Sequence, residues 1–166
     1  LFYFYSTFNI SLFLLMNIVL FTNSNIGISL YTFLIKHKVK IKLVVCGNYQ
    51  TLIQFKFKNV TSVLYNKKKL NKITELLNNK NIDLGVVACF TILPKKIWNT
   101  PKYKMINMHY SLLYSYAGPN PVQWQIHNKE KKTGVTVHFI TNKIDQGKIV
   151  VQKEILMPKL ERYFWQ

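Results

Sequence analysis

The segment MINMHYSLL, residues 105–113, carries the side chains best suited to chemistry in this sequence. Asn107 and His109 lie two positions apart at the end of an apolar run, so on a β-strand both side chains point to the same face of a sheet. An amide donor beside an imidazole can stabilise the negative charge that develops on a carbonyl oxygen during nucleophilic attack. A single His on an apolar strand also fits a structural role, so the spacing alone leaves both interpretations open.

Asp145 and Gly147 form an Asp-x-Gly pattern, which is typical of a turn between two strands and by itself indicates no more than a turn. Three further histidines are less suggestive. His138 lies in the apolar run VTVHF and is expected in the core or just behind a site. His37 and His127 are expected at the surface, near the ends of helices.

The segments that must position these side chains alternate between strands and helices. Apolar runs rich in β-branched residues predict strands at 18–21, 40–46, 60–65, 84–89, 104–108, 134–140 and 148–155. Apolar residues at helical spacing predict helices at 28–36, 67–79 and 121–127, whereas the pattern leaves 47–59 undetermined. This order predicts an α/β fold, a Rossmann-like and mostly parallel sheet with helices on both faces.

Ligands of such sheets bind beyond the carboxyl ends of the strands. Polar segments in that position are 22–27, 107–111 and 144–147. The first of them, TNSNIG, has one glycine where a dinucleotide-binding loop has three, so an NAD site is not expected. Its backbone N–H groups could hold an anion, or it could be an ordinary turn. The sequence contains neither a nucleophile elbow nor a P-loop.

The composition fits a single globular domain. The chain has 166 residues, 49% of them hydrophobic, which excludes wholesale disorder. It carries 23 Lys and Arg against 6 Asp and Glu, for a net charge of +17. All the cations except Arg162 are Lys, which A+T-rich codons favour, so the charge indicates attraction to nucleic acid or anionic lipid only weakly. Cys46 and Cys89 lie in apolar runs and form neither a disulfide framework nor a zinc motif.

Residues 1–21 contain no charge and could span a bilayer as a helix. No cation precedes Lys36, however, and a secretory signal has a positive segment before its apolar stretch. Because the sequence begins with Leu, we favour Met16 as the natural start, with residues 1–15 as a leader of doubtful status and 16–166 as the domain. A membrane anchor formed by residues 1–21 and a genuine extra structural segment are the alternatives.

Three motifs in this order resemble the catalytic domain of the formyltransferases that use 10-formyltetrahydrofolate. They are NIDLGVVACFTILPK (81–95), MINMHYSLLYSYAGPNPVQW (105–124) and TGVTVHFITNKIDQGKIVVQ (133–152). The resemblance covers about residues 16–156 and is strongest over 81–152. It implies transfer of a formyl group to an acceptor amine, with 10-formyltetrahydrofolate as cosubstrate and no metal. The enzyme is expected in the cytoplasm, or in an organelle if the source is eukaryotic, with no stable membrane partner.

The resemblance also implies which residues form the site. Its catalytic Asn, His and Asp fall on Asn107, His109 and Asp145: the first two would stabilise the oxyanion, and the third would hold the imidazole and help to move a proton. The cosubstrate would contact Phe90, Thr91, Ile92, Leu93, Ile144 and Gly147, and a substrate loop would include Ser111, Gly118 and Pro121.

Some features depart from the family pattern. Tyr114 replaces a loop Pro, and Ala117 replaces the usual loop Arg, which allows a catalytically inactive member as an alternative. The segment 47–59 lacks the basic insertion typical of members that act on methionyl-tRNA. The sequence stops at Gln166, before the usual closing helix, so we expect a catalytic domain truncated at its C-terminal end. Initiator methionyl-tRNA is the favoured acceptor, and a nucleotide-linked amino sugar is the alternative.

Overall fold

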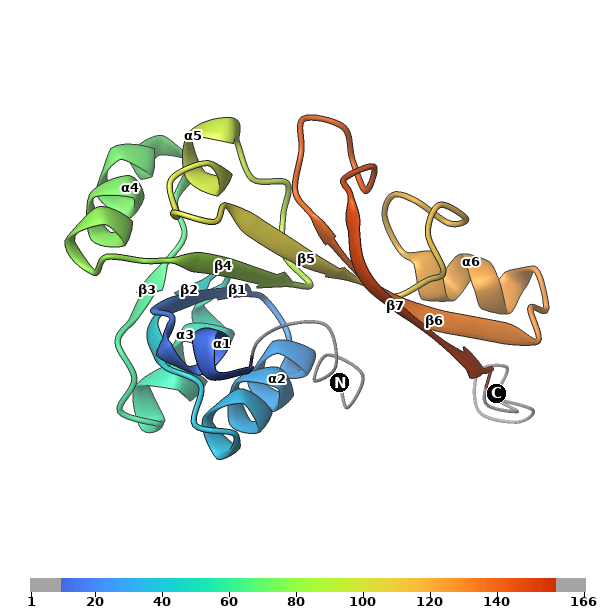
Figure 1. Cartoon of the computed structure of the whole chain (residues 1–166), viewed down its shortest axis with the longest axis horizontal. Coiled ribbons are helices and arrows are strands. Elements are labelled where there is room, and N and C mark those ends of the chain that lie inside the picture. The colour runs from blue at the N-terminus through green and yellow to red at the C-terminus, as the bar shows by residue number, and fades with distance from the viewer. Residues whose placement is uncertain (1–9, 158–166) are drawn as a thin grey trace.

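A seven-stranded sheet forms the centre of the computed structural model, which describes residues 10–157 (Figure 1). The strands are β1 (Ile18–Thr22), β2 (Ile41–Cys46), β3 (Ser62–Leu64), β4 (Leu84–Ala88), β5 (Met105–His109), β6 (Lys132–Phe139) and β7 (Ile149–Leu156). Their order across the sheet is β3-β2-β1-β4-β5-β6-β7. The first five run parallel, and β6 and β7 continue the sheet antiparallel. The predicted α/β fold with a mostly parallel sheet is therefore confirmed.

The three predicted helices are present, and the structure adds two short helices and a longer one in the segment that the sequence left undetermined. They are α1 (Ile10–Leu15), α2 (Asn25–Lys36), α3 (Tyr49–Phe57), the 3-10 helix η2 (Lys67–Lys69), α4 (Leu70–Asn79), α5 (Lys95–Trp98) and α6 (Pro121–His127). The short additions are α1 and α5. The longer one is α3, which begins where the Asn48 side chain accepts a hydrogen bond from the Thr51 backbone at 2.8 Å, a typical N-cap. Leu52 and Phe55, three residues apart, are buried on its inner side.

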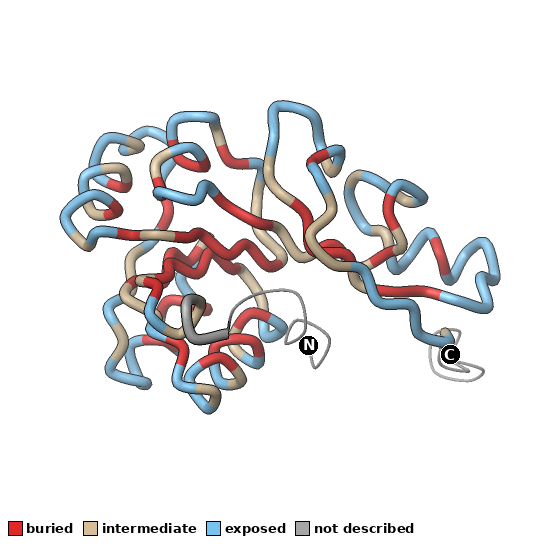
Figure 2. The backbone as a smooth tube through the Cα atoms, in the orientation of Figure 1, coloured by how far each residue is buried: buried red, intermediate tan, exposed pale blue. Residues whose placement is uncertain are grey.

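Helices cover both faces of the parallel part of the sheet, as the sequence predicts. Figure 1 shows α4 and α5 above the sheet and α2 and α3 below it. Successive strand residues therefore enter different cores: Val19 and Phe21 pack with α4 and α5, whereas Ile18 and Leu20 pack with α2 and α3. Figure 2 shows the consequence, since the central strands are almost wholly buried while the outer sides of the helices are exposed.

The same alternation places the end of β5. Met105 is fully buried in the cluster under α4 and α5, and Ile106 belongs to the opposite cluster. Asn107 and His109 must therefore lie on the α4–α5 face, farther along the strand than Met105. The sheet thus presents both side chains on one face at the carboxyl end of β5.

The described part of the expected leader contacts the core. Phe13 and Leu14 of α1 pack against the cluster on the α2–α3 face, and the Met16 N–H donates to the Phe13 carbonyl at 3.3 Å. Residues 1–9 lie outside the described residues. Within 10–157, no helix is both long and apolar enough to cross a bilayer. Phe13 and Leu14 of the expected leader therefore pack against the domain.

Replacing Phe13 by Ala tests this packing. We expect the free energy of unfolding to fall by about 1–2 kcal/mol, less than the roughly 3–5 kcal/mol of a fully buried Phe, because Phe13 is only partly buried. The matched control is Leu15→Ala in the same helix; Leu15 is exposed, so the change should stay within about 0.5 kcal/mol. Urea denaturation followed by circular dichroism measures both.

A chain that begins at Met16 should keep its fold, because β1 begins only at Ile18, and should lose at least as much stability as Phe13→Ala. Equal stability of the shortened and the full chain would show that α1 contributes nothing to the domain.

Candidate active site

Four side chains from three segments meet on the α4–α5 face of the sheet. Asn107 of β5 lies directly opposite His138 of β6 in the antiparallel register, so the two side chains share a face. His109 is two residues farther along β5. Asp145 belongs to the loop between β6 and β7, which folds back over the two strands. We call Asn107, His109, His138 and Asp145 the Asp145 cluster.

The Asp145 carboxylate joins the members of this cluster. Its Oδ2 atom lies 3.4 Å from His109 Nδ1, and its Oδ1 atom lies 3.4 Å from His138 Nε2. Asn107 Nδ2 lies 3.5 Å from Asp145 Oδ1 and 3.3 Å from His138 Nε2. The side chains are well shielded, with 6% of His109, 2% of His138 and 12% of Asp145 exposed. Little water therefore competes with these contacts.

Two glycines allow the loops to approach so closely. A Cβ at Gly147 would lie 1.6 Å from the Phe139 carbonyl oxygen, so the Asp145 loop can pass against β6 only with glycine at this position. Gly118 has a φ of 103°, a conformation that L side chains rarely adopt, and its N–H donates to Asp145 Oδ2 at 2.9 Å. The carboxylate is thereby fixed from the backbone as well as from the imidazoles.

The environment of Asp145 favours its ionised form. Burial by itself would raise the pKa of the carboxyl group, and this is the largest single influence. The hydrogen bond with His138, the Gly118 N–H and the charges of His109 and His138 act in the opposite direction. Together they hold the pKa of Asp145 below its ordinary value. The cluster therefore contains a carboxylate that stays charged at neutral pH.

Both imidazoles also contact a backbone carbonyl. His109 Nε2 lies 2.8 Å from the Tyr116 oxygen, and His138 Nδ1 lies 3.0 Å from the Phe139 oxygen. A carbonyl oxygen can only accept, so these two nitrogens carry the hydrogen. Each ring is thus held between a backbone carbonyl and Asp145, which fixes its orientation.

The loop between β5 and α6 is fastened internally and to the Asp145 loop. Ser111 is fully buried: its hydroxyl donates to the Ser115 carbonyl at 2.9 Å, and its own carbonyl accepts from Thr136 Oγ1 at 2.6 Å. The peptide bond between Leu113 and Tyr114 is cis. The Tyr114 hydroxyl donates to the Gly147 carbonyl at 3.4 Å. The residue that replaces the family's loop Pro therefore contacts the loop that carries Asp145.

Pro121 occupies the first turn of α6, a position where its missing N–H costs no hydrogen bond. Its carbonyl accepts from Gln125 Nε2 at 2.9 Å, and the same amide nitrogen donates to the Tyr110 carbonyl at 2.9 Å. Gln125 is itself buried and accepts from the Thr133 hydroxyl through Oε1. These bonds attach α6 to the loop and to β6.

The residues expected to contact a cosubstrate lie on two segments. Phe90 and Leu93 pack with the cluster under α4 and α5, and Thr91 is partly exposed. Ile92 and Ile144 are 70% and 52% exposed. The backbone N–H groups of 90–93 donate to no other group within the described part of the chain. Exposed apolar side chains and backbone N–H groups without an acceptor are thus present in these segments. None of the hydrogen bonds among residues 10–157 joins the segment 90–93 to the segment 144–147.

The sequence identified three of the four members of the Asp145 cluster. His138 was expected in the core or just behind a site, and it contacts both Asn107 and Asp145. The signal for its place is the register, because His138 pairs with Asn107 across the two strands. Tyr116 gave no sequence signal, since it acts through its backbone oxygen. Residues 10–157 contain no group of three or more His, Cys, Asp or Glu arranged to hold a metal ion.

This arrangement suits attack of a nucleophile on a carbonyl group. The amide of Asn107 and the imidazole of His109 lie on one face and can donate to an oxygen that gains negative charge. Asp145 holds the imidazole and can support the transfer of a proton. The same geometry offers no activated nucleophile of the protein's own, because no Ser, Thr or Cys hydroxyl or thiol is bonded to either histidine in the described region.

Comparisons with known proteins agree with this chemistry. Residues 32–161 match the family described as formyl transferase. A methionyl-tRNA formyltransferase of Flavobacterium psychrophilum is 42% identical over 85 residues, which is 51% of this chain and 27% of that protein. The methionyl-tRNA formyltransferase of Azobacteroides pseudotrichonymphae is 48% identical over 73 residues, or 44% of this chain and 22% of that protein. The matched part of this chain thus spans about a quarter of the length of these curated relatives.

Solved structures share the fold. A phosphoribosylglycinamide formyltransferase from Anaplasma phagocytophilum superposes with a TM-score of 0.77 at 22% identity, covering 89% of this chain and 75% of that one. A glycinamide ribonucleotide transformylase from Symbiobacterium toebii gives 0.75 at 19% identity, covering 86% and 74%. The family match extends over most of the chain and includes every member of the Asp145 cluster, and this chain therefore belongs to the formyl transferase family.

Proposed function

We propose that this chain transfers a formyl group from 10-formyltetrahydrofolate to an amine, and that Asn107, His109 and Asp145 carry out the transfer. The observation that supports this proposal is the contact of one largely shielded carboxylate with both the imidazole and the amide on the same face of the sheet. In this arrangement the two donors lie next to each other at the carboxyl end of β5.

The cosubstrate supplies the formyl carbon, which is bonded to a folate nitrogen. A bond forms between the acceptor nitrogen and this carbon, the bond to the folate nitrogen breaks, and the proton lost by the amine ends on the folate nitrogen. The Asn107 amide donates to the formyl oxygen as it gains charge. The His109 Nε2–H, which contacts the Tyr116 carbonyl at 2.8 Å in the structure, would leave that carbonyl to donate to the same oxygen. Asp145, charged because its pKa is low, holds His109 through Nδ1 and assists the proton transfer.

The segments 90–93 and 144–147 would hold the folate ring. The free backbone N–H groups of 90–93 fit a heterocycle with several acceptors, and the exposed side chains of Ile92 and Ile144 fit its flat apolar faces. Gly147 acts indirectly, because it lets the segment 144–147 pass against the Phe139 carbonyl, where a Cβ would collide. These backbone N–H groups and apolar side chains suit an organic ligand.

We propose methionyl-tRNA as the acceptor. Relatives that carry this printed activity are 42% and 48% identical to the chain over the matched segment. A net charge of +17 favours a polyanionic acceptor over a neutral amine. The segment YAGPNPVQW, residues 116–124, instead resembles the branch that acts on nucleotide-linked amino sugars, so this class is the alternative.

An assay of formyl transfer from labelled 10-formyltetrahydrofolate tests the acceptor. We expect transfer to initiator methionyl-tRNA, and less to elongator methionyl-tRNA or to an amino-sugar nucleotide at equal concentration. The protein used is the longest natural chain that contains these residues, because the curated relatives are longer than the matched segment. Transfer only to the sugar would contradict the proposed acceptor and leave the chemistry intact.

Substitution of the site residues tests the chemistry. His109→Ala should lower turnover by about 10²–10³ or more, the scale of removing one oxyanion donor. Asp145→Asn and Asn107→Ala should lower it severely, and the losses should not add if the groups act as a unit. His127→Ala is the matched control, because His127 is exposed at the end of α6 and should leave turnover unchanged.

The melting temperature must be measured beside each rate. If His109 were only structural, activity would fall in proportion to the loss of folded protein. A well-folded His109→Ala protein with normal turnover would exclude the proposed mechanism. Absence of turnover in the unchanged, well-folded chain would instead favour the inactive-member alternative.

Asp145 also predicts how stability depends on pH. Its pKa is lower in the folded state than the value of about 3.9 usual for an unfolded chain. The ionised carboxylate therefore adds stability that is fully present above about pH 4 and is lost as the pH falls through the folded-state value. We expect Asp145→Asn to be more destabilised relative to the unchanged protein at pH 6 than at pH 3. Urea denaturation at both pH values measures the difference, and an equal difference would contradict the low pKa.

A further inference from the structure

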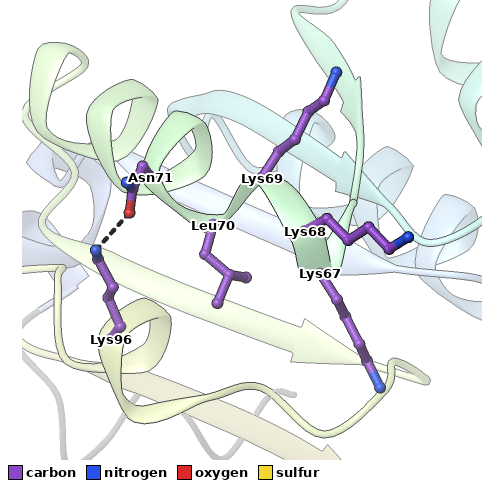
Figure 3. Close-up of a pocket in the computed structure, with 6 residues that line it drawn as sticks. All are labelled: Lys67, Lys68, Lys69, Leu70, Asn71 and Lys96. Atoms are coloured by element: carbon purple, nitrogen blue, oxygen red, sulfur yellow. Dashed lines mark hydrogen bonds between the residues drawn. The ribbon is translucent and has the colours of Figure 1, made fainter.

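Three lysines follow the carboxyl end of β3, on the same edge of the sheet as the end of β5 with the Asp145 cluster, and a fourth lies nearby on α5. Lys67, Lys68 and Lys69 form η2, which follows β3, and Lys96 lies in α5, which follows β4. With Leu70 and Asn71 they line one open depression (Figure 3). We call these four lysines the lysine surface. Nothing in the proposed mechanism uses them.

The lysine surface has the geometry of a contact with many charges. Consecutive residues of a 3-10 helix point about 120° apart. In Figure 3 the side chains of Lys67, Lys68 and Lys69 accordingly extend in three different directions, while Lys96 reaches from α5 to Asn71, with Nζ 2.6 Å from Oδ1. Ammonium groups that diverge cannot surround one phosphate. They can contact successive phosphates along a chain.

These cations are not neutralised within the described structure. Between residues 10 and 157, none of the four lysines has a carboxylate within ion-pair distance, whereas Lys132 pairs with Glu154 at 2.7 Å. The whole chain contains only 6 acidic residues, and Asp145 is committed to the cluster. Four uncompensated charges on two neighbouring short helices produce a local positive potential that attracts polyanions.

The residues that line the depression favour nucleic acid over a membrane as the binding partner. A protein surface that binds a bilayer inserts apolar side chains beside its cations. Leu70 is the one apolar residue of the depression, and it packs against the cluster under α4 and α5. The lysine surface therefore offers charge without an apolar side chain free to insert, which is the composition of a phosphate-backbone contact.

We propose that the lysine surface binds the phosphate backbone of the RNA that carries the acceptor amine. This inference rests on the proposed function. Four strand spacings separate β3 from β5 in the sheet, about 19 Å at roughly 4.8 Å each. Phosphates of one strand repeat about every 3.4 Å in a duplex, so an RNA end of a few nucleotides can reach from the lysine surface to Asn107 and His109.

The test removes three charges at the proposed surface and three elsewhere. The test variant is Lys67→Gln, Lys68→Gln and Lys69→Gln in one protein. The matched control replaces Lys36, Lys40 and Lys58 by Gln; these are exposed and lie at the ends of α2 and α3 or just before β2, at the opposite edge of the sheet. Both proteins lose the same net charge, so only the position differs.

The measurement is the binding of unacylated tRNA over a series of salt concentrations. Each lost phosphate contact should reduce the slope of log affinity against log salt by about 0.7–0.9, so we expect a reduction of about 2–3 for the test variant and below about 1 for the control. Equal reductions in both variants would overturn the proposal, because net charge alone would then explain the binding. Vesicles containing phosphatidylserine serve as the second probe; loss of vesicle binding with unchanged tRNA binding would also overturn it.

Far-UV circular dichroism establishes that both variants are folded. If the triple variant is not, the single variants Lys67→Gln and Lys69→Gln provide the same test, each with an expected slope change of about 0.7–0.9. No formyl donor takes part in the binding measurement. Failure of formyl transfer to methionyl-tRNA therefore counts against the proposed function, whereas an unchanged salt slope counts against the lysine surface.

Discussion

The Asp145 carboxylate is the interaction on which the candidate site depends. It lies within 3.5 Å of atoms of His109, His138 and Asn107, and it accepts from the Gly118 backbone at 2.9 Å. These groups come from β5, β6 and the loop before α6, so one side chain connects three segments. Shielding a carboxylate from water costs free energy unless hydrogen-bond donors surround it. The donors around Asp145 offset this cost, and the shared carboxylate in turn holds them in place.

The change of strand direction after β5 decides where this carboxylate can lie. Because β6 runs antiparallel to β5, His138 is directly opposite Asn107, and the chain that leaves β6 must turn back over the sheet before β7 begins. Gly147 lets that loop pass against the Phe139 carbonyl. Because β6 and β7 are antiparallel neighbours, a loop can join them without a crossover helix. The antiparallel extension therefore places a loop, with Asp145 in it, on the face that carries Asn107 and His109.

The lysine surface and the Asp145 cluster differ in the kind of interaction that they can make. Charges at Lys67–Lys69 and Lys96 are exposed, so they act through screened and salt-dependent attraction. The cluster is shielded, so its contacts are short-ranged and directional. The lysine surface can therefore orient an acceptor through its phosphates without bringing phosphate charge into the Asp145 cluster. The separation follows from the strand order, which places β3 at the edge and β5 near the centre.

The sequence by itself determined the order of the seven strands and of the helices α2, α4 and α6, although it did not predict the short helices α1 and α5. It also determined that Asn107 and His109 share a face, because side-chain alternation along a strand is local. It left the helix α3 undetermined, because only three of its nine residues are buried and its start depends on the Asn48 cap. The tertiary structure alone decided that His138 joins the site, that the Tyr116 carbonyl binds His109, and that Phe13 and Leu14 pack on the core. These contacts connect residues far apart in the chain or use backbone atoms, and neither leaves a pattern in the order of residue types.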